Sequence, residues 1–492
     1  MAKPALAPAP SRPRAFFARH PKKLVALALA LVGPTLAHAV IALTTRMDPP
    51  AIHVVVEEPL VSKGDADLRR IGDSYARLRG KILEVRLTGT PEQIGWRHGR
   101  LLRPEMNENE GVLYGQFNHY VPIPPLRWLI MDISRVQFRS VDQGMPDARR
   151  REIAAQAQAF SPDPFDSVLP TYQRFVFLQS LYDISLSFEH SPLLGCTSFA
   201  LTGEAAAGGH TLLARNFDFE AGPIFDEKKA VFLVLEEGKI PYASVSWPGL
   251  IGAVSGMNAE GLSLVVHGGR AREPVPVGEP VVHTTRELLG NARTTAEALV
   301  ILATKAPMVS HMIMLADATG DVAIAERAPG EPLFVRRGKG KIPLTNHFEG
   351  PLAMDPANQQ IETVTSTRPR RIRLDELLSN LPGGASVEQV VGILRDRKGV
   401  GGTPLALGNR RSIDALIATH SVVMDSTAKV LWVSEGPHLV GRYLRFDLAR
   451  LLDPAFTPSP ADPIGEIPAD PILNDGAYQA WIAAGSPHKG EP

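Results

Sequence analysis

Cys196 is the only cysteine in the chain of 492 residues. A lone thiol can form neither an intrachain disulfide nor a cysteine-rich metal cluster. It is therefore either a buried small apolar residue or a reactive group. The residues around it in the sequence bear on that choice.

A predicted β-hairpin places charged residues beside this thiol. Two predicted strands, 197–201 and 210–217, flank a loop that follows Cys196. If they pair antiparallel about the centre of the loop, Cys196 faces the region of Arg215 and Asp218, with a register error of about two residues. A cation near a thiol favours the thiolate, and a carboxylate can orient an amine or hold the arginine. The pattern favours a reactive cysteine, with an ordinary ion pair at a strand end as the alternative.

The residue before the thiol offers a cleavage point. If the chain is cut between Gly195 and Cys196, the new α-amine lies on the same residue as the thiol. Such an amine has a pKa of about 7.7–8.0, which suits a general base near neutral pH. It would activate the thiol without a catalytic histidine. A histidine brought close by the fold, as in thiol proteases, remains the alternative base.

Five motifs, in order along the chain, resemble the N-terminal-nucleophile hydrolases. Among these, the chain is most similar to the acyl-coenzyme A:6-aminopenicillanic acid acyltransferase family, whose relatives include acid ceramidase, N-acylethanolamine amidase and choloylglycine hydrolase. The motifs are GWRHGRLL (95–102), GCTSFAL followed by RNFD (195–201 and 215–218), GMNAEGLSL (256–264), LTNHF (344–348) and SVVMDSTAKVLWVSEG (421–436). The resemblance covers about residues 85 to 440.

The resemblance implies both a fold and a chemistry. The fold is α+β, a four-layer αββα sandwich with a helix-rich N-terminal segment. The chemistry begins with self-cleavage between Gly195 and Cys196, after which Cys196 attacks an acyl amide and passes the acyl group to water or to another amine. Arg215 and Asp218 match the family's arginine and aspartate beside the nucleophile, and Asn346 matches the asparagine that donates to the oxyanion. No cofactor and no metal are implied.

The remaining site residues implied by the resemblance are less specific. Backbone amides around His267 and Gly268 would be the second oxyanion donor, and Arg368 would contact the substrate. Bile-salt hydrolases place an asparagine where this chain has Gly268, so bile-salt specificity is not implied. The expected substrate is a small acyl amide or a lipid-like molecule, and the oligomeric state is left open. The alternatives are a phospholipase-type esterase of the same superfamily and a non-catalytic envelope protein that kept the fold.

The N-terminus predicts export. Residues 1–23 contain six basic and no acidic side chains, and residues 24–43 form a run without formal charge. A helix of that length matches the hydrocarbon core of a bilayer, and the basic flank would stay in the cytoplasm. Ala37-His38-Ala39 has the form of a signal-peptide cleavage site, so a membrane anchor and a secreted form are both open. Either way the catalytic part would be periplasmic or extracellular.

Composition and pattern predict the organisation of the rest. The chain has 52 basic and 52 acidic residues, a balance that does not predict a nucleic-acid partner. Strands, a helix pair, strands, a second helix pair and strands follow one another after Cys196, which predicts antiparallel sheets with helices on their outer faces. The expected segments are a basic tail with an anchor or signal (1–50), a helix-rich pro-region (51–195), the catalytic core (196–450) and a peripheral Pro-rich tail (451–492).

Overall fold

The computed structural model describes residues 21–53, 60–63, 68–187, 194–219 and 223–488. The chain divides into two compact units. One consists of Met1–Met47 and Phe117–Arg139, and the other of Asp48–Gln116 and Ser140–Pro492. The second unit contains both β-sheets and every candidate residue named above.

Two sheets form the centre of this second unit. The described strands of the larger sheet are, in spatial order, β1 (Val61–Lys63), β2 (Leu68–Ile71), β3 (Ser74–Arg79), β4 (Ile82–Gly89), β7 (Ala230–Glu236), β8 (Tyr242–Ser246), β9 (Ser255–Asn258), β10 (Ser263–Gly268), β11 (His311–Ala316), β12 (Val322–Arg327) and β13 (Phe334–Gly338). Those of the smaller sheet are β14 (Lys341–Leu344), β5 (Leu194–Leu201), β6 (Leu212–Phe219), β15 (Ala418–Asp425), β16 (Val430–Ser434), β17 (Tyr443–Asp447) and β18 (Glu466–Ile467). The pairing is antiparallel except between β4 and β7.

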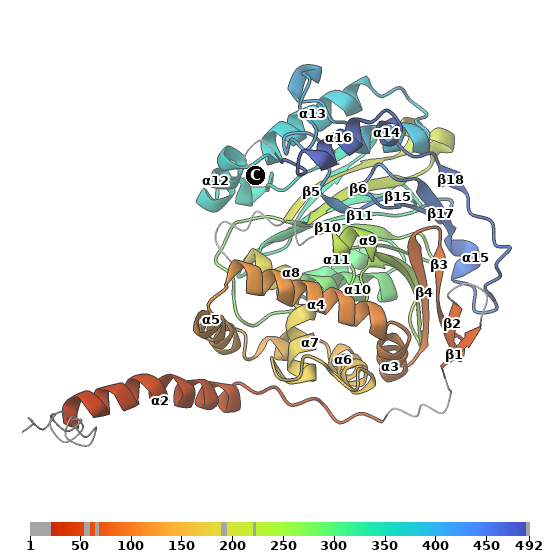
Figure 1. Ribbon diagram of the computed structural model, residues 1–492. Helices are drawn as coiled ribbons and strands as arrows, with labels where there is room; N and C mark the ends of the chain where they lie inside the picture. Colours follow the sequence, from red (N-terminus) through yellow and green to blue (C-terminus); the bar gives the residue numbers. More distant parts are fainter. Residues whose placement is uncertain (1–20, 54–59, 64–67, 188–193, 220–222, 489–492) are drawn as a thin grey trace, which may run out of the picture. The chain divides into compact units, whose positions relative to one another are not determined.

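Helices cover the outer face of each sheet, so that the four-layer αββα arrangement expected from the sequence is confirmed (Figure 1). Beside the larger sheet lie α3 (Pro91–Leu101), α4 (Arg103–Tyr120), α6 (Asp147–Ala159), α7 (Thr171–Gln179), α8 (Leu181–Leu186), α10 (Val281–Asn291) and α11 (Thr295–Ala303). Beside the smaller sheet lie α12 (Pro356–Val364), α13 (Thr367–Asn380), α14 (Val387–Leu394) and α16 (Ala477–Ala483). Two short helices, α9 (Ile224–Glu227) and α15 (Leu448–Leu451), connect strands.

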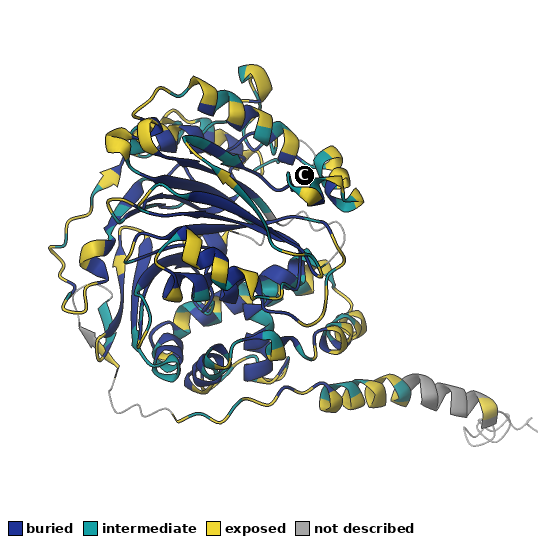
Figure 2. Ribbon diagram, turned by 180° about the vertical axis from the view of Figure 1, so that it is seen from behind, coloured by how far each residue is buried: buried dark blue, intermediate teal, exposed yellow. Residues whose placement is uncertain are grey.

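Alternation along the strands builds two apolar layers. On β5, Ala200 packs into the core between the sheets, whereas Phe199 and Leu201 pack against the outer helices. This is the period of two that a strand imposes, with neighbouring side chains on opposite faces. Figure 2 shows the result: the strands are mostly buried, and exposed residues gather on the outer helices. Cys196, two and four residues before Ser198 and Ala200, therefore faces the space between the sheets.

Two parts of the predicted organisation differ in the structure. The segment 51–195 is not separate from the catalytic core, because its strands β1 to β4 join the larger sheet and β4 pairs directly with β7 across the expected boundary at residue 195. The segment 451–492 is not merely peripheral either. Its β18 pairs with β17, and Tyr478 and Trp481 of α16 are buried against the core. Long-range strand pairing leaves no local pattern, which explains why both contacts escaped prediction.

The unit Met1–Met47 with Phe117–Arg139 contains two helices that pack together. Within it, α2 (Pro21–Thr44) contacts α5 (Pro124–Gln137), where His38 Nδ1 lies 2.9 Å from the Asp132 carboxylate and its ring stacks on Trp128. Residues 1–20, which carry most of the basic tail, lie outside the described residues. The expected membrane anchor finds no support, since no helix in the described part of the chain is long and apolar enough to cross a bilayer.

A buried carboxyl group joins α8 to α10. Both oxygens of Asp183 accept from the Val281 amide at the start of α10, at 3.2 and 3.1 Å. Burial raises the pKa of Asp183 to about 8, against an ordinary value of 3.8, and the Val281 amide offsets only part of that rise. The folded protein therefore holds this proton at neutral pH, where the unfolded chain releases it.

We expect Asp183→Asn to be more stable than the parent at about pH 8, with a gap that closes towards about pH 5. Because the folded pKa is raised, the parent loses stability as pH rises from the unfolded to the folded value, at up to about 1.4 kcal/mol per pH unit. Asparagine keeps an acceptor for the Val281 amide but never ionises. Thermal unfolding across this pH range measures the gap, with the exposed Glu388→Gln as the control. A gap that widens towards low pH would contradict the expectation.

Candidate active site

The pairing of β5 with β6 places Cys196 opposite Phe217 and Gly195 opposite Asp218. The sequence predicted a partner near residue 215, and the observed register lies within the margin of that prediction. The difference arises because β6 begins only at Leu212, after two short 3-10 turns. Moving the loop centre by one residue moves the partner by two. Arg215 is then a diagonal neighbour of Cys196 on the same face of the sheet.

Arg215 contacts the thiol directly. Its Nη2 lies 3.1 Å from Cys196 Sγ, and both side chains are fully buried. The guanidinium also packs over the Phe217 ring, 4.4 Å from the centroid. Its two terminal nitrogens also donate hydrogen bonds to the Val254 carbonyl, to Ser255 Oγ at 2.7 Å and to the Val266 carbonyl at 2.5 Å, which hold the guanidinium in place. Arg215 is thus a fixed cation whose position does not depend on a bound molecule.

Asp218 lies on the other face of the strand, beside Gly195. A Cβ added to Gly195 would lie only 3.1 Å from Asp218 Oδ2, so this carboxylate closely approaches the peptide bond that precedes the thiol. Asp218 and Cys196 Sγ therefore face opposite sides of the smaller sheet. The structure brings both close to residue 195, with the carboxylate next to the backbone and the thiol between the sheets.

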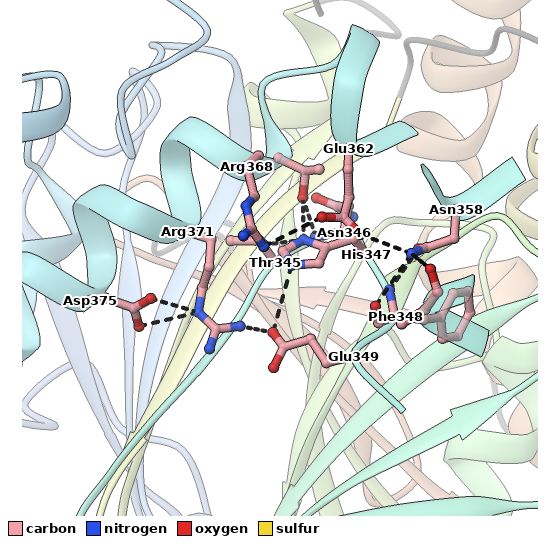
Figure 3. A network of polar contacts seen from close by, with 12 residues as sticks. Thr345, Asn346, His347, Phe348, Glu349, Asn358, Glu362, Arg368, Arg371 and Asp375 are labelled. Atoms are coloured by element: carbon pink, nitrogen blue, oxygen red, sulfur yellow. Dashed lines mark hydrogen bonds and ion pairs between the residues drawn. The ribbon is translucent and has the colours of Figure 1, made fainter. Parts of the chain in front are cut away.

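Asn346 binds the backbone of the nucleophile residue. Its Oδ1 accepts from the Cys196 amide at 2.7 Å, and its Nδ2 donates to the Gly268 carbonyl at 3.0 Å. Asn346 lies in the segment Thr345–Phe348, which follows β14 (Figure 3). A hydrogen bond joins this segment to the start of α13, where Thr367 Oγ1 accepts from the backbone N–H of Asn346 at 2.8 Å. The backbone N–H of Cys196 can only donate a hydrogen bond. It must therefore face the oxygen, and not the nitrogen, of the Asn346 side-chain amide.

The region of His267 and Gly268 lies at the site. The Gly268 carbonyl accepts from Asn346, and the Val266 carbonyl accepts from Arg215. These contacts show carbonyl oxygens, which are acceptors, at the position where the second oxyanion donor was expected. The His267 ring bonds to Ser198 Oγ at 2.6 Å.

Two buried histidines lie near the thiol, and neither bonds to it among the described residues. His267 bonds to Ser198, and His420 Nε2 bonds to Ser255 Oγ at 2.9 Å. Burial, with Arg215 adding to it, lowers the pKa of both rings well below the ordinary value, so both are neutral. In the described part of the chain, no direct contact with the thiol therefore supports a histidine as the base that takes its proton.

Arg370 reaches the site, and sequence reasoning missed it. Its Nη1 donates to the Cys196 carbonyl at 2.5 Å, and its Nη2 donates to Asn346 Oδ1 at 3.0 Å. Arg368, the predicted substrate contact, has a side chain that is 56% exposed and pairs with Glu362 at 3.4 Å (Figure 3). Several arginines follow one another at the start of α13, and only the phase of the helix decides which one faces inward.

Tyr182 of α8 was also missed. It is buried, its ring stacks on Phe217 at 6.3 Å, and its phenol oxygen has no hydrogen-bond partner among the described residues. Burial raises its pKa well above the ordinary value, and a nearby Cys196 thiolate would raise it further. Its position N-terminal to the thiol, in a helix with no motif of its own, gave no signal in the sequence.

An apolar cavity adjoins Phe217, the cross-strand partner of Cys196. Segments from both sides of residue 196 line it: Met106, Asn109, Glu110, Leu113, Phe175, Leu178, Gln179, Leu181, Tyr182, Phe217, Phe219, Phe225, Trp247, Pro248, Gly249, Leu250, Val254 and Val282. The Val254 carbonyl also accepts from Arg215. Two residues of the cavity lining, Phe217 and Val254, therefore also belong to the surroundings of the thiol. Such a mostly apolar lining with a few polar groups is typical of small-molecule sites.

The thiol itself is neutral in this uncut chain. Burial raises the pKa of Cys196 above its ordinary value, and Arg215 reverses only part of that effect by its charge and its hydrogen bond. A base that takes the thiol proton would therefore be needed before the sulfur can act as a nucleophile.

Comparison with known proteins supports the family resemblance over part of the chain. Residues 205–408 match the model of the acyl-coenzyme A:6-aminopenicillanic acid acyl-transferase family, which confirms the resemblance inferred from the sequence. The matched region contains Arg215, Asp218 and Asn346 and begins after Cys196. No curated protein matches the chain.

Solved structures similar to this chain include three hydrolases. The Caenorhabditis elegans ortholog of N-acylethanolamine-hydrolyzing acid amidase is 16% identical, with 47% of this chain and 93% of that chain covered and a TM-score of 0.36. Penicillin V acylase from Agrobacterium tumefaciens is 18% identical, with 56% and 99% covered and a TM-score of 0.35. A mutant conjugated bile acid hydrolase from Clostridium perfringens is 13% identical, with 56% and 97% covered and a TM-score of 0.35.

Proposed function

We propose that the protein is a self-processing N-terminal cysteine amidohydrolase or acyltransferase that acts on a non-peptide acyl amide. The observation that carries the proposal is the contact of the single thiol with a buried, fixed cation, Arg215 Nη2, at 3.1 Å. Asn346 and Arg370 add hydrogen bonds to the amide and carbonyl of the same residue. A structural cysteine would need partners for its buried backbone groups, but it requires no buried guanidinium at its sulfur.

Self-cleavage is the first proposed step. Cys196 Sγ attacks the carbonyl carbon of Gly195, the bond from that carbon to the Cys196 nitrogen breaks, and the thiol proton passes to the departing nitrogen. Water then hydrolyses the thioester, which leaves a carboxyl group on Gly195 and a free thiol and amine on Cys196. Asp218, next to Gly195, would stabilise the new ammonium group.

The catalytic cycle uses the freed amine as the base. The thiol proton moves to the Cys196 amine, and the thiolate attacks the carbonyl carbon of the substrate amide. The ammonium group returns the proton to the leaving nitrogen as the C–N bond breaks, which leaves an acyl thioester. Water or a second amine then takes the acyl group, and the thiol is restored. Asn346 Nδ2 is proposed to donate to the oxyanion in both half-reactions.

The acyl group is proposed to bind in the cavity beside Phe217. Rings of Phe217, Phe225 and Trp247 contribute to its wall, and Trp247 Nε1 is tied to the Phe225 carbonyl at 2.6 Å. Burying an apolar acyl chain against these rings removes apolar surface from water, which favours binding. The exported location predicted from the N-terminal sequence is part of the proposal.

Mass spectrometry of the purified full chain under denaturing conditions tests the proposal, together with a panel of N-acyl amides from phenylacetyl to long fatty acyl. We expect a fragment that begins with Cys196, and release of the amine from at least one apolar acyl amide. Matched esters in the same panel distinguish amidase from esterase activity. An active preparation that contains only uncut chain would refute self-processing.

A further inference from the structure

The apolar cavity beside the proposed nucleophile contains two buried polar atoms that have no hydrogen-bond partner in the part of the chain that the structure describes. They are Asn109 Oδ1 and Tyr182 Oη. Buried polar groups in folded proteins are nearly always hydrogen-bonded, so an unpartnered group on the lining of a cavity requires an explanation, and a bound group that completes it is one. We propose that the acyl group of the substrate bears a hydroxyl remote from its carbonyl, and that Asn109 Oδ1 accepts a hydrogen bond from that hydroxyl. This inference rests on the proposed function.

The orientation of the Asn109 amide is set by the protein. Asn109 on α4 is 5% exposed, and its Nδ2 donates to the Pro248 carbonyl at 3.3 Å. Because a carbonyl can only accept, the nitrogen must face Pro248, and the oxygen is left as an acceptor on the cavity wall. The other buried side-chain amide of the lining, Gln179, is fully used, since its Nε2 donates to the Gly249 carbonyl and its Oε1 accepts from the Ile251 amide.

The charge around Asn109 favours a neutral donor over an ammonium group. Glu110 is the one charged side chain among the described residues that line the cavity. Its Oε1 is bonded to Arg174 Nε and accepts from the Tyr114 hydroxyl at 3.3 Å, so this carboxylate already has a counter-ion. Burial raises the pKa of Glu110, and the charge and hydrogen bond of Arg174 offset part of that rise. A hydroxyl group needs only the neutral acceptor that Asn109 supplies.

Asn109 and Tyr182 are placed differently with respect to Cys196. Tyr182 stacks on Phe217, the residue opposite Cys196. Asn109 bonds instead to Pro248, and the residue before it, Trp247, has its ring beside that of Phe217, with 5.7 Å between the two centroids. The Tyr182 hydroxyl is thus available near the reacting carbonyl, and Asn109 meets a more distant part of the acyl group.

The cavity of about 100 Å³ also exceeds the volume that one water requires, about 10–15 Å³.

Two matched pairs of substrates test the inference: phenylacetyl against 4-hydroxyphenylacetyl amides, and octanoyl against 8-hydroxyoctanoyl amides of the same amine. We expect the parent enzyme to favour the hydroxylated member of at least one pair by about tenfold or more in kcat/KM. Asn109→Leu, which keeps the volume but has no hydrogen-bonding atoms, should lose that preference. Asn107→Leu on the same helix, which does not line the cavity, should keep it.

Binding of the free acids to the uncut Cys196→Ala chain, measured by calorimetry, separates this inference from the proposed function. Tighter binding of the hydroxylated acid, lost in Cys196→Ala with Asn109→Leu, supports the inference even if no amide is turned over. Equal binding of both members of both pairs to the Cys196→Ala chain overturns it, whether or not the parent cleaves amides. Turnover that persists in Cys196→Ala refutes the proposed nucleophile and leaves the binding result to decide on the hydroxyl.

Discussion

Cys196→Ala is expected to yield a chain that stays uncut and that releases no amine from acyl amides, with a loss of turnover of about 10⁴-fold or more. The physical reason is that the sulfur is proposed to form both covalent bonds, first to the Gly195 carbonyl carbon and then to the substrate. No second thiol can replace it, because the sequence contains one cysteine. Mass spectrometry reports the cut, and amine release reports turnover.

Two further variants make this result specific to the sulfur. Cys196→Ser should process slowly, since a hydroxyl can make the same acyl shift as a poorer nucleophile. Ser198→Ala lies two residues further along β5 on the same face, and its hydroxyl bonds to His267 rather than to the reacting carbon. The Ser198→Ala chain should therefore be cut between residues 195 and 196, as the parent chain is. Cleavage of the Cys196→Ala chain at the same bond would rule out the proposed self-processing.

Asn346→Asp is expected to lower kcat by about 10²- to 10³-fold with a smaller change in KM. The substitution keeps an oxygen that accepts from the Cys196 amide nitrogen but removes Nδ2, the proposed oxyanion donor. A donor that acts on the transition state affects kcat, whereas a residue that only binds substrate affects KM. Steady-state kinetics on processed protein, with the processed fraction measured separately, distinguishes the two effects.

Asn358→Asp is the matched control for Asn346. Asn358 lies in the same polar network, where its Oδ1 accepts from the Phe348 amide at 2.8 Å and its Nδ2 donates to the Phe348 carbonyl (Figure 3). Its replacement should lower the thermal stability and leave kcat of the folded protein near the parent value. A kcat for Asn346→Asp within a few-fold of the parent would contradict the donor role.

Local patterns allowed the hairpin and its charged residues to be predicted. A short loop between two apolar strands set the antiparallel pairing of β5 with β6, and the remaining register error was the length of the turn. Asn346 became a candidate through the resemblance of the LTNHF segment to a family motif. Its partners at Cys196 and Gly268 depend on how the two sheets face each other, which no local pattern encodes.

Contacts between distant segments account for what was not predicted. Arg370 faces the site and Arg368 does not because of their positions around α13. Tyr182 and Asn109 come from helices that precede the thiol and meet the cavity only after α4, α7 and α8 have packed beside the larger sheet. Their place at the cavity depends on tertiary packing, and neither helix carries a sequence motif that marks it.

The parallel pairing of β4 with β7 has a consequence for the processed protein. Leu83 to Gly89 is hydrogen-bonded along Ala230 to Glu236, so a cut at residue 195 leaves two chains that share one sheet and one core. The intact chain refolds as a single molecule, whereas the cut chains must first meet, and their refolding rate then depends on protein concentration. Cleavage would therefore convert a reversible fold into one whose persistence in dilute solution is set by its unfolding rate.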